Sequence, residues 1–80
     1  MIVNGFEVPR EAEAVCIKVM QESVEFRASD IEQAAQKAGV PHSGPSQGLC
    51  GRIADRLIQR ERKAKRIKAT NYPYWQWVRK

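Results

Sequence analysis

Three stretches of the chain repeat apolar residues at the spacing of an amphipathic helix. The stripe within residues 10–23 consists of Ala12, Val15, Cys16, Val19 and Met20. The stripe within residues 30–38 consists of Ile31, Ala34, Ala35 and Ala38. The stripe within residues 47–63 consists of Cys50, Ile53, Ala54, Leu57 and Ile58. Because residues at i, i+3, i+4 and i+7 share one helix face, the pattern predicts three helices around one core.

Residues that commonly begin or end helices bound these stretches. Pro9 suits the first turn of a helix, where its missing N–H costs nothing. Ser29, followed three residues later by Glu32, forms a capping box that predicts the start of the second helix. Gly39 is expected to end that helix, and Ser46 is the predicted N-cap of the third.

Beyond residue 63 the spacing changes from helical to alternating. Residues 65–69 and 74–78 are predicted to be strands, and the loop residues 70–73 supply the turn between them. Trp75 and Trp77 share one face of the second strand. We expect this face to pack on the helices, because a small core needs large side chains.

Two short segments lie outside the helices and this hairpin. In residues 1–8, Asn4-Gly5 separates two short apolar stretches, and this dipeptide favours a tight turn because both residues tolerate positive φ. We expect a small hairpin or an ordered arm there. Residues 24–27 break the helical spacing and predict a short extended segment in which Phe26 points inward.

Charge is divided unequally between the two halves of the chain. Residues 1–40 hold four basic and seven acidic residues, a net charge of −3, whereas residues 41–80 hold ten basic and two acidic residues, a net charge of +8. The basic half also carries the helical and alternating apolar patterns, so we expect it to fold. A folded surface with one-sided positive charge suits a polyanion such as nucleic acid.

Length and composition narrow the class of protein. Eighty residues predict a single small domain. No apolar run approaches the roughly 20 residues of a membrane span, and the N-terminal segment has no basic region before an apolar stretch. We therefore expect a cytoplasmic protein without membrane contact. Cys16 and Cys50 fall in apolar helical stripes and are expected to be buried free thiols.

No catalytic or metal-binding motif is recognisable in the sequence. One His and two isolated Cys cannot supply the four protein ligands of a structural zinc site. His42 stands in a loop without a Cys, Asp or Glu neighbour, so we interpret it as a plain loop residue. The segment Gly44–Gly48 lacks the Lys-Ser/Thr ending of a phosphate-binding loop. We expect a protein that is not an enzyme and that uses no cofactor or metal.

The predicted order of elements resembles that of a winged helix-turn-helix domain. The resemblance covers about residues 10–78 and rests on SDIEQAAQKAGV as the supporting helix, CGRIADRLIQRERK as the recognition helix and KRIKATNYPYWQWV as the wing. It implies a mainly α fold with a small β-hairpin, in one domain over residues 1–80, with an arm at 1–8 and a wing at 64–78. The connection at residues 42–46 is longer than the usual turn of this motif.

The resemblance also implies which residues bind DNA. In this family the third helix enters the major groove and the wing contacts the backbone or minor groove, which here corresponds to residues 47–63 and 64–78. The residues assigned to DNA binding on this basis are Ser46, Gln47, Arg52, Arg56, Gln59, Arg60, Lys63, Lys65, Arg66 and Lys68. Arg can pair bidentately with guanine and Gln with adenine. The implied function is that of a small bacterial or phage regulator of transcription.

Two other functions fit the same sequence. Winged-helix domains also serve as protein-docking modules, and the basic face suits an acidic protein partner. Tyr72 and Tyr74 would instead suit stacking on the bases of a single strand or an RNA. The exposure of Trp75, Trp77 and the surface of the helix predicted at residues 10–23 distinguishes these functions. A wide exposed apolar patch favours a protein partner, whereas buried Trp beside a continuous cationic strip favours DNA. Strong sequence specificity from so small a module would require a dimer, so an oligomer is a further possibility.

Overall fold

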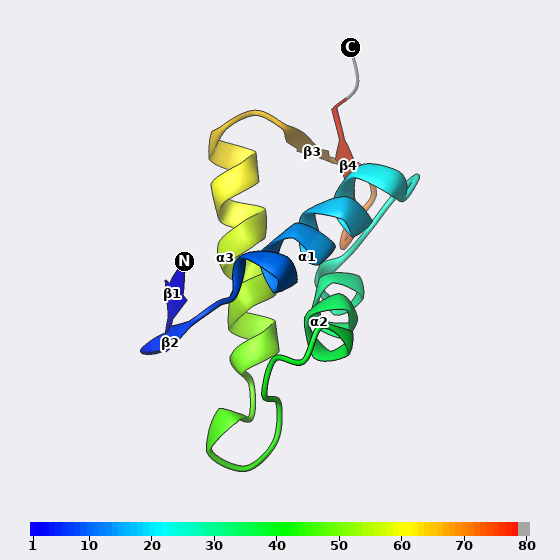
Figure 1. Cartoon of the computed structure of the whole chain (residues 1–80). Coiled ribbons are helices and arrows are strands. Elements are labelled where there is room, and N and C mark those ends of the chain that lie inside the picture. The colour runs from blue at the N-terminus through cyan, green and yellow to red at the C-terminus, as the bar shows by residue number, and fades with distance from the viewer. Residues whose placement is uncertain (79–80) are drawn as a thin grey trace.

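The computed structural model describes residues 1–78, which form three helices and two small antiparallel hairpins (Figure 1). In chain order the elements are β1 (Ile2–Val3), β2 (Phe6–Glu7), α1 (Arg10–Glu22), α2 (Ala28–Lys37), the 3-10 turn η1 (Gly44–Ser46), α3 (Leu49–Lys63), β3 (Ile67–Ala69) and β4 (Trp75–Trp77). The predicted mainly α fold with a C-terminal hairpin is confirmed. Arg79 and Lys80, which belong to the basic half, lie outside the described residues.

The core lies where the three helices meet. Ile31, Ala35, Ile53 and Leu57 are fully buried there, as the helical spacing predicts. In α1 the buried positions are Ala12, Cys16 and Met20. Three residues of the predicted stripes are less enclosed than expected. Ala38, the C-cap of α2, is exposed. In α1, Val19 is half-buried and Val15 is 40% exposed. Both lie at the edge of α1, beside α2, where no further element covers them within residues 1–78.

The start of α2 differs from the prediction. The helix begins at Ala28, with Arg27 as its N-cap, so the capping box predicted for Ser29 and Glu32 is wrong. The carboxylate of Asp30 instead accepts a hydrogen bond of 3.0 Å from the backbone N–H of Arg27. A carboxylate three residues after the N-cap satisfies the free N–H at the cap, and Asp30 performs this role two residues earlier than expected.

The predicted end of α2 is confirmed. Gly39 adopts φ +93°, and the N–H of Val40 donates to the carbonyl oxygen of Ala35 at 3.1 Å. This 6→1 bond is typical of a helix end that requires one residue in the left-handed backbone conformation. Glycine adopts that conformation without a Cβ clash.

Helix α3 begins two residues later than predicted. Gly48 is its N-cap, with φ +83°, whereas Ser46 belongs to the 3-10 turn and Gln47 lies between the two elements. The predicted N-cap at Ser46 is therefore wrong. Near the start of α3, a Cβ at Gly51 would lie 2.6 Å from Oε1 of Glu32. The missing side chain lets α2 and α3 approach closely.

The C-terminal hairpin is antiparallel, with Ile67 opposite Trp77 and Lys68 opposite Gln76. Its strands are shorter than residues 65–69 and 74–78, and both Trp75 and Trp77 are half-buried against the core. Phe26 is fully buried and forms a β-bridge with Trp75 through hydrogen bonds of 2.9 and 2.7 Å. The predicted extended segment between α1 and α2 is thus joined to the hairpin.

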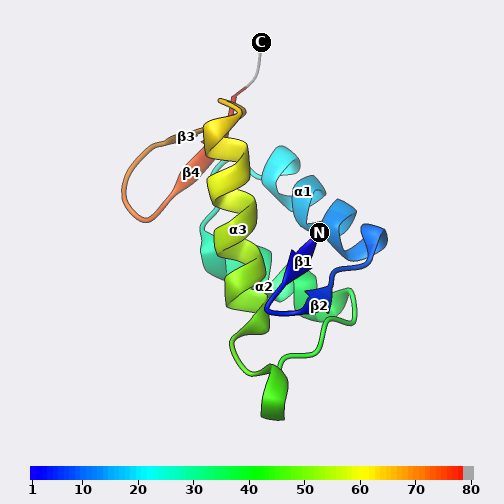
Figure 2. The ribbon, with the colours of Figure 1, turned by 90° about the vertical axis from the view of Figure 1, so that its left-hand side faces the viewer.

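The N-terminal segment forms the hairpin β1–β2, with Asn4 and Gly5 both at positive φ in its turn. Val3 is 2% exposed and belongs to the core, so β1 packs on α3 and the segment is more than a loose arm (Figure 2). No helix in residues 1–78 is both long and apolar enough to cross a membrane.

Candidate nucleic-acid interface

The outward face of α3 carries a stripe of polar and basic side chains. Figure 2 looks onto this helix, with the β3–β4 hairpin on one side and the β1–β2 hairpin on the other. The exposed residues of the stripe are Arg52, Arg56, Gln59 and Lys63. Their spacing of four, three and four residues places them on one side of a helix, opposite the buried Ile53 and Leu57. We call this set the α3 stripe.

The cations of the α3 stripe are free of acidic partners. Arg52, Arg56 and Lys63 form no ion pair within residues 1–78. The side-chain oxygen of Gln59 accepts a hydrogen bond of 2.9 Å from Nη2 of Arg62, which adds a fourth cation beside the stripe. The three unpaired charges are therefore available to an external anion.

Two further exposed cations follow α3 at the start of the C-terminal hairpin. Lys65 is exposed and adopts φ +62°, directly after the end of α3. Lys68 is exposed on β3, next to the buried Ile67, so its side chain lies on the outer face of the hairpin. Lys65 and Lys68 form no ion pair among the described residues. Together with the α3 stripe they supply five unpaired cations.

Two of the residues assigned to DNA, Arg60 and Arg66, are instead bound to acids of the protein itself. Glu61 is only 2% exposed. Its carboxylate accepts hydrogen bonds from Nε of Arg66 at 2.5 Å, from Nη2 of Arg66 at 3.0 Å and from Nε of Arg60 at 2.9 Å. Arg60 also forms an ion pair through Nη1 with Glu13 of α1. These contacts connect α1, α3 and the hairpin.

The electrostatics of this cluster favour an ionised Glu61. Hydrogen bonds from Arg66, and after them those from Arg60, hold the pKa of Glu61 below its usual range, although burial opposes them. Sequence reasoning missed the role of Glu61, yet a signal was present. Glu61 lies three, four and seven residues after Ile58, Leu57 and Ala54, so it belongs to the buried stripe of α3.

Ser46 and Gln47 do not lie on α3 as expected. With Pro45 and Leu49 they line a small hollow beside Asn4 and Phe6 of the N-terminal hairpin. Ser46 is half-buried there, and Gln47 is exposed. The structure places both residues at the N-terminal end of the helix, beyond the α3 stripe rather than within it.

The aromatic side chains near the hairpin divide into two groups. Trp75 and Trp77 are half-buried and pack against the core. Tyr74 is half-buried, and the guanidinium of Arg27 lies 5.7 Å from the centre of its ring. Tyr72, at the turn between β3 and β4, is 99% exposed. The hairpin therefore presents one free ring rather than a wide aromatic patch.

Comparison with known proteins identifies no family. No protein-family model matches the chain, and neither a curated protein nor a solved structure is significantly similar to it. The chemistry of the site therefore has to be derived from its own residues.

The remaining candidate chemistry is that of the thiols and the histidine. Cys16 and Cys50 are both buried and free. Burial, and to a smaller extent the neighbouring Cys50, raises the pKa of Cys16 to about 11. Burial also raises the pKa of Cys50. His42 is exposed in its loop, and within residues 1–78 no three His, Cys, Asp or Glu side chains come together in a way that could hold a metal ion.

Proposed function

We propose that this chain is a winged helix-turn-helix protein that binds double-stranded DNA without catalysing a reaction, as a small bacterial or phage regulator of transcription would. The order of its elements supports this topology: α1, the extended segment at Phe26, α2, α3 and then the β3–β4 hairpin. The bridge between Phe26 and Trp75 fixes the hairpin beside the helices, where a wing belongs.

The observation that carries the proposal is the row of unpaired cations on the outer side of α3 and of the hairpin. A helix fits the major groove of DNA, where Arg52 and Arg56 have the donors to pair with guanine and the amide of Gln59 has the groups to pair with adenine. Lys63, Lys65 and Lys68 would contact phosphates, which position the protein without reading sequence.

Arg60 and Arg66 have a different role in this proposal. Because both are held by Glu61, and Arg60 also by Glu13, their charge is largely balanced within the fold. We assign them to fixing the orientation of the wing relative to α3. The α3 stripe with Lys65 and Lys68 is then the surface that meets DNA.

Trp75 and Trp77 are half-buried against the core, which supports DNA over a docked protein partner at this face. The surface of α1 points the other way, because Val15 is 40% exposed there and favours a protein partner on that side of the molecule. The single free ring of Tyr72 gives a single-strand binder little stacking surface, since such binders stack several successive bases.

A titration against duplex DNA, single-stranded DNA and heparin tests the proposal. Fluorescence anisotropy is measured at about 50 and 200 mM salt, and three phosphate contacts predict a loss of duplex affinity of about 40-fold between the two. We expect duplex to bind more tightly than single strand or heparin at both concentrations. Heparin binding as tight as duplex binding would indicate a general polyanion binder. Failure of all three to bind the folded protein would favour docking of an acidic protein.

A further inference from the structure

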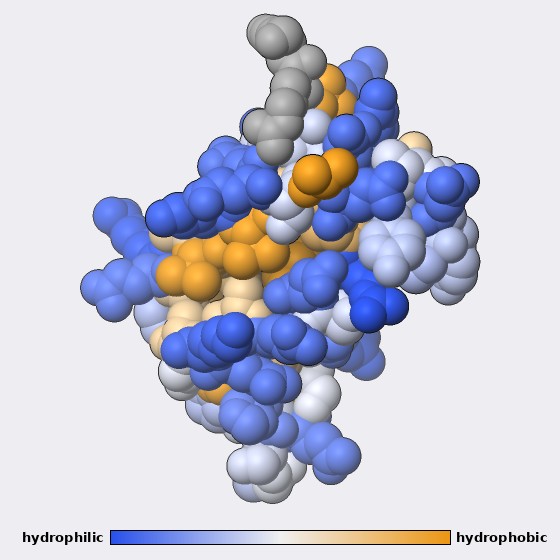
Figure 3. Space-filling model, turned by 90° about the vertical axis from the view of Figure 1, so that its right-hand side faces the viewer, coloured by the Kyte–Doolittle hydropathy of each residue, from blue (hydrophilic) through white to orange (hydrophobic). Residues whose placement is uncertain are grey.

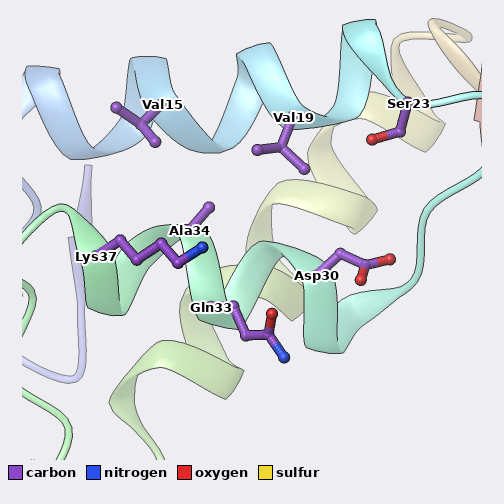
Figure 4. A pocket seen from close by; sticks show the side chains of 7 residues that line it. All are labelled: Val15, Val19, Ser23, Asp30, Gln33, Ala34 and Lys37. Atoms are coloured by element: carbon purple, nitrogen blue, oxygen red, sulfur yellow. The ribbon is translucent and has the colours of Figure 1, made fainter.

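A groove runs between α1 and α2 on the side of the molecule that faces away from the α3 stripe. Figure 4 shows its two walls: Val15 and Val19 on α1 with Ser23 at its C-cap, and Asp30, Gln33, Ala34 and Lys37 on α2. The hollow has a volume of about 280 Å³. The two helices run in opposite directions along it. The Val15 end of the groove therefore lies beside the end of α2, and the Ser23 end lies beside the start of α2.

The centre of the groove is apolar. Val15 is 40% exposed and Val19 is half-buried, although both belong to the apolar stripe of α1. Ala34 lies opposite them on α2. The space-filling view in Figure 3 shows apolar residues gathered in a hollow of this face, with polar residues around them. No segment within residues 1–78 covers this strip, so the apolar surface is free for a partner.

The two ends of the groove carry opposite charges. Lys37 lies at the Val15 end and Asp30 at the Ser23 end (Figure 4). They are seven residues apart on α2, two helical turns, and therefore on the same face of the helix. Lys37 forms no ion pair within the described residues, and Asp30 uses only Oδ2 in its bond to the N–H of Arg27. Both charges can still accept an external partner.

We infer that this groove is the interface of a homodimer, in which a second copy of the chain lays its own α1–α2 face against it. A two-fold axis that lies in the plane of the interface and crosses the groove at a right angle turns the two faces together and reverses the direction of the groove. The Lys37 of each copy then meets the end that carries Asp30 in the other, and the apolar strips face one another. Such an isologous pairing uses one patch twice. The lining holds one acid and one base. A strongly acidic or strongly basic partner would therefore form no more favourable charge contacts here than a second copy of the chain.

The pairing leaves both α3 stripes uncovered. Figures 2 and 3 view opposite sides of the molecule, with α3 nearest the viewer in Figure 2 and the groove in Figure 3. The two stripes of the dimer therefore face outward in different directions. This inference rests on the proposed function: a dimer of DNA-binding chains would bind two separate duplex segments rather than two adjacent half-sites of one duplex.

Sedimentation velocity over a wide range of concentration tests this inference. The unmodified chain is expected to shift from monomer to dimer as concentration rises. Val15→Glu places a charge in the apolar strip and should raise the dimer dissociation constant at least about tenfold. Val24→Glu is the matched control, because Val24 is 81% exposed and does not line the groove. Circular dichroism checks that each variant is folded.

A charge-exchange experiment tests the two-fold arrangement itself. Lys37→Glu and Asp30→Lys should each be monomeric alone, because each brings like charges together. An equimolar mixture should restore the dimer, since Asp30 of the first variant meets Lys37 of the second and the two new charges meet at the other end. A chain that stays monomeric at every concentration would overturn the inference. So would a dimer that persists in Val15→Glu and Lys37→Glu, which would place the interface elsewhere.

Discussion

The side chain of Arg66 donates two hydrogen bonds to the buried carboxylate of Glu61, from Nε at 2.5 Å and from Nη2 at 3.0 Å. The backbone N–H of Arg66 also donates to the carbonyl oxygen of Glu61 at 3.0 Å. The residue that leads into the β3–β4 hairpin is thus joined to the last turn of α3 by both its main chain and its side chain. The orientation of the β3–β4 hairpin depends on this buried acid.

Glu61→Gln is expected to lower the free energy of unfolding by about 1.5–3 kcal/mol, the usual range for hydrogen bonds to charged groups. A glutamine retains one acceptor and directs an NH₂ group toward the guanidinium groups that Glu61 binds. Urea unfolding followed by circular dichroism measures the change. Glu22→Gln is the control, since Glu22 forms an exposed ion pair of 3.9 Å with Lys18 and should cost less than about 1 kcal/mol. Equal effects of the two variants would contradict a structural role for Glu61.

The stabilisation from Glu61 should depend on pH in a defined direction. The hydrogen bonds from Arg66 lower its pKa in the folded state. A group of this kind contributes its full stabilisation above the unfolded pKa of about 4.3, and the contribution is lost as pH falls through the lower folded pKa. The stability difference between the unmodified chain and Glu61→Gln should therefore be constant near neutral pH and shrink in acid. Urea unfolding at a series of pH values would show it, and a difference that grows in acid would contradict the assignment.

The two thiols should react slowly in the native protein. Cys16 and Cys50 are buried, and burial raises the pKa of each, so little reactive thiolate is present near neutral pH. Leu57→Ala, a truncation of a fully buried residue, should cost about 2–5 kcal/mol and speed the labelling through unfolding. Val24→Ala, at an 81% exposed position, should leave the labelling rate unchanged. Labelling with an aromatic disulfide reagent measures these rates, and rapid labelling of both thiols without unfolding would be inconsistent with the core.

The sequence was sufficient to predict the three helices and the C-terminal hairpin, because their apolar spacing is regular. It was less informative at the starts of α2 and α3. Ser29 and Glu32 fit the rules for a capping box, but Arg27 and Asp30 take these two positions two residues earlier, and local rules do not choose between the two pairs. Helix α3 begins after Gly48, whose backbone lies in the left-handed region. This start position depends on how the preceding loop packs.

The candidate site was predicted in part. The exposed members of the α3 stripe follow from helical spacing, and the structure places Arg52 and Arg56 on its outer face. The inward position of Glu61 was predictable from the spacing of α3, but the pairing of Arg60 with Glu13 was not, because it depends on α1 bringing Glu13 close to Arg60. Contacts between residues far apart in the sequence leave no trace in local periodicity.

Lys65→Gly should stabilise the protein by about 0.5–1 kcal/mol, because Lys65 occupies the left-handed region at φ +62°, where a Cβ is unfavourable. Its N–H donates to the carbonyl oxygen of Arg62 at 3.0 Å, a helix-ending bond that glycine would keep. Lys63→Gly removes the same charge inside α3 and should instead destabilise by about 1 kcal/mol. Thermal unfolding compares the two variants, and a loss of stability in both would refute the strain at Lys65.

The central claim is that the α3 stripe reads duplex DNA while the wing anchors it. Fluorescence anisotropy with two duplexes, one selected from random sequence by the unmodified chain and one of unrelated sequence, tests it through Arg56→Ala and Lys68→Ala. Lys18→Ala is the control, because Lys18 lies on α1 in an ion pair with Glu22. The affinity of this variant for each duplex should stay close to that of the unmodified chain, because it loses only one charge, far from the α3 stripe.

Titration of both duplexes with Arg56→Ala and Lys68→Ala across a range of salt concentrations is the most direct measurement. Lys68→Ala should weaken binding equally on both duplexes and reduce the salt slope by about one. Arg56→Ala should cost about 1–3 kcal/mol on the selected duplex and less on the unrelated one. Unchanged affinity of both variants for both duplexes, with the fold intact by circular dichroism, would contradict DNA binding by this face.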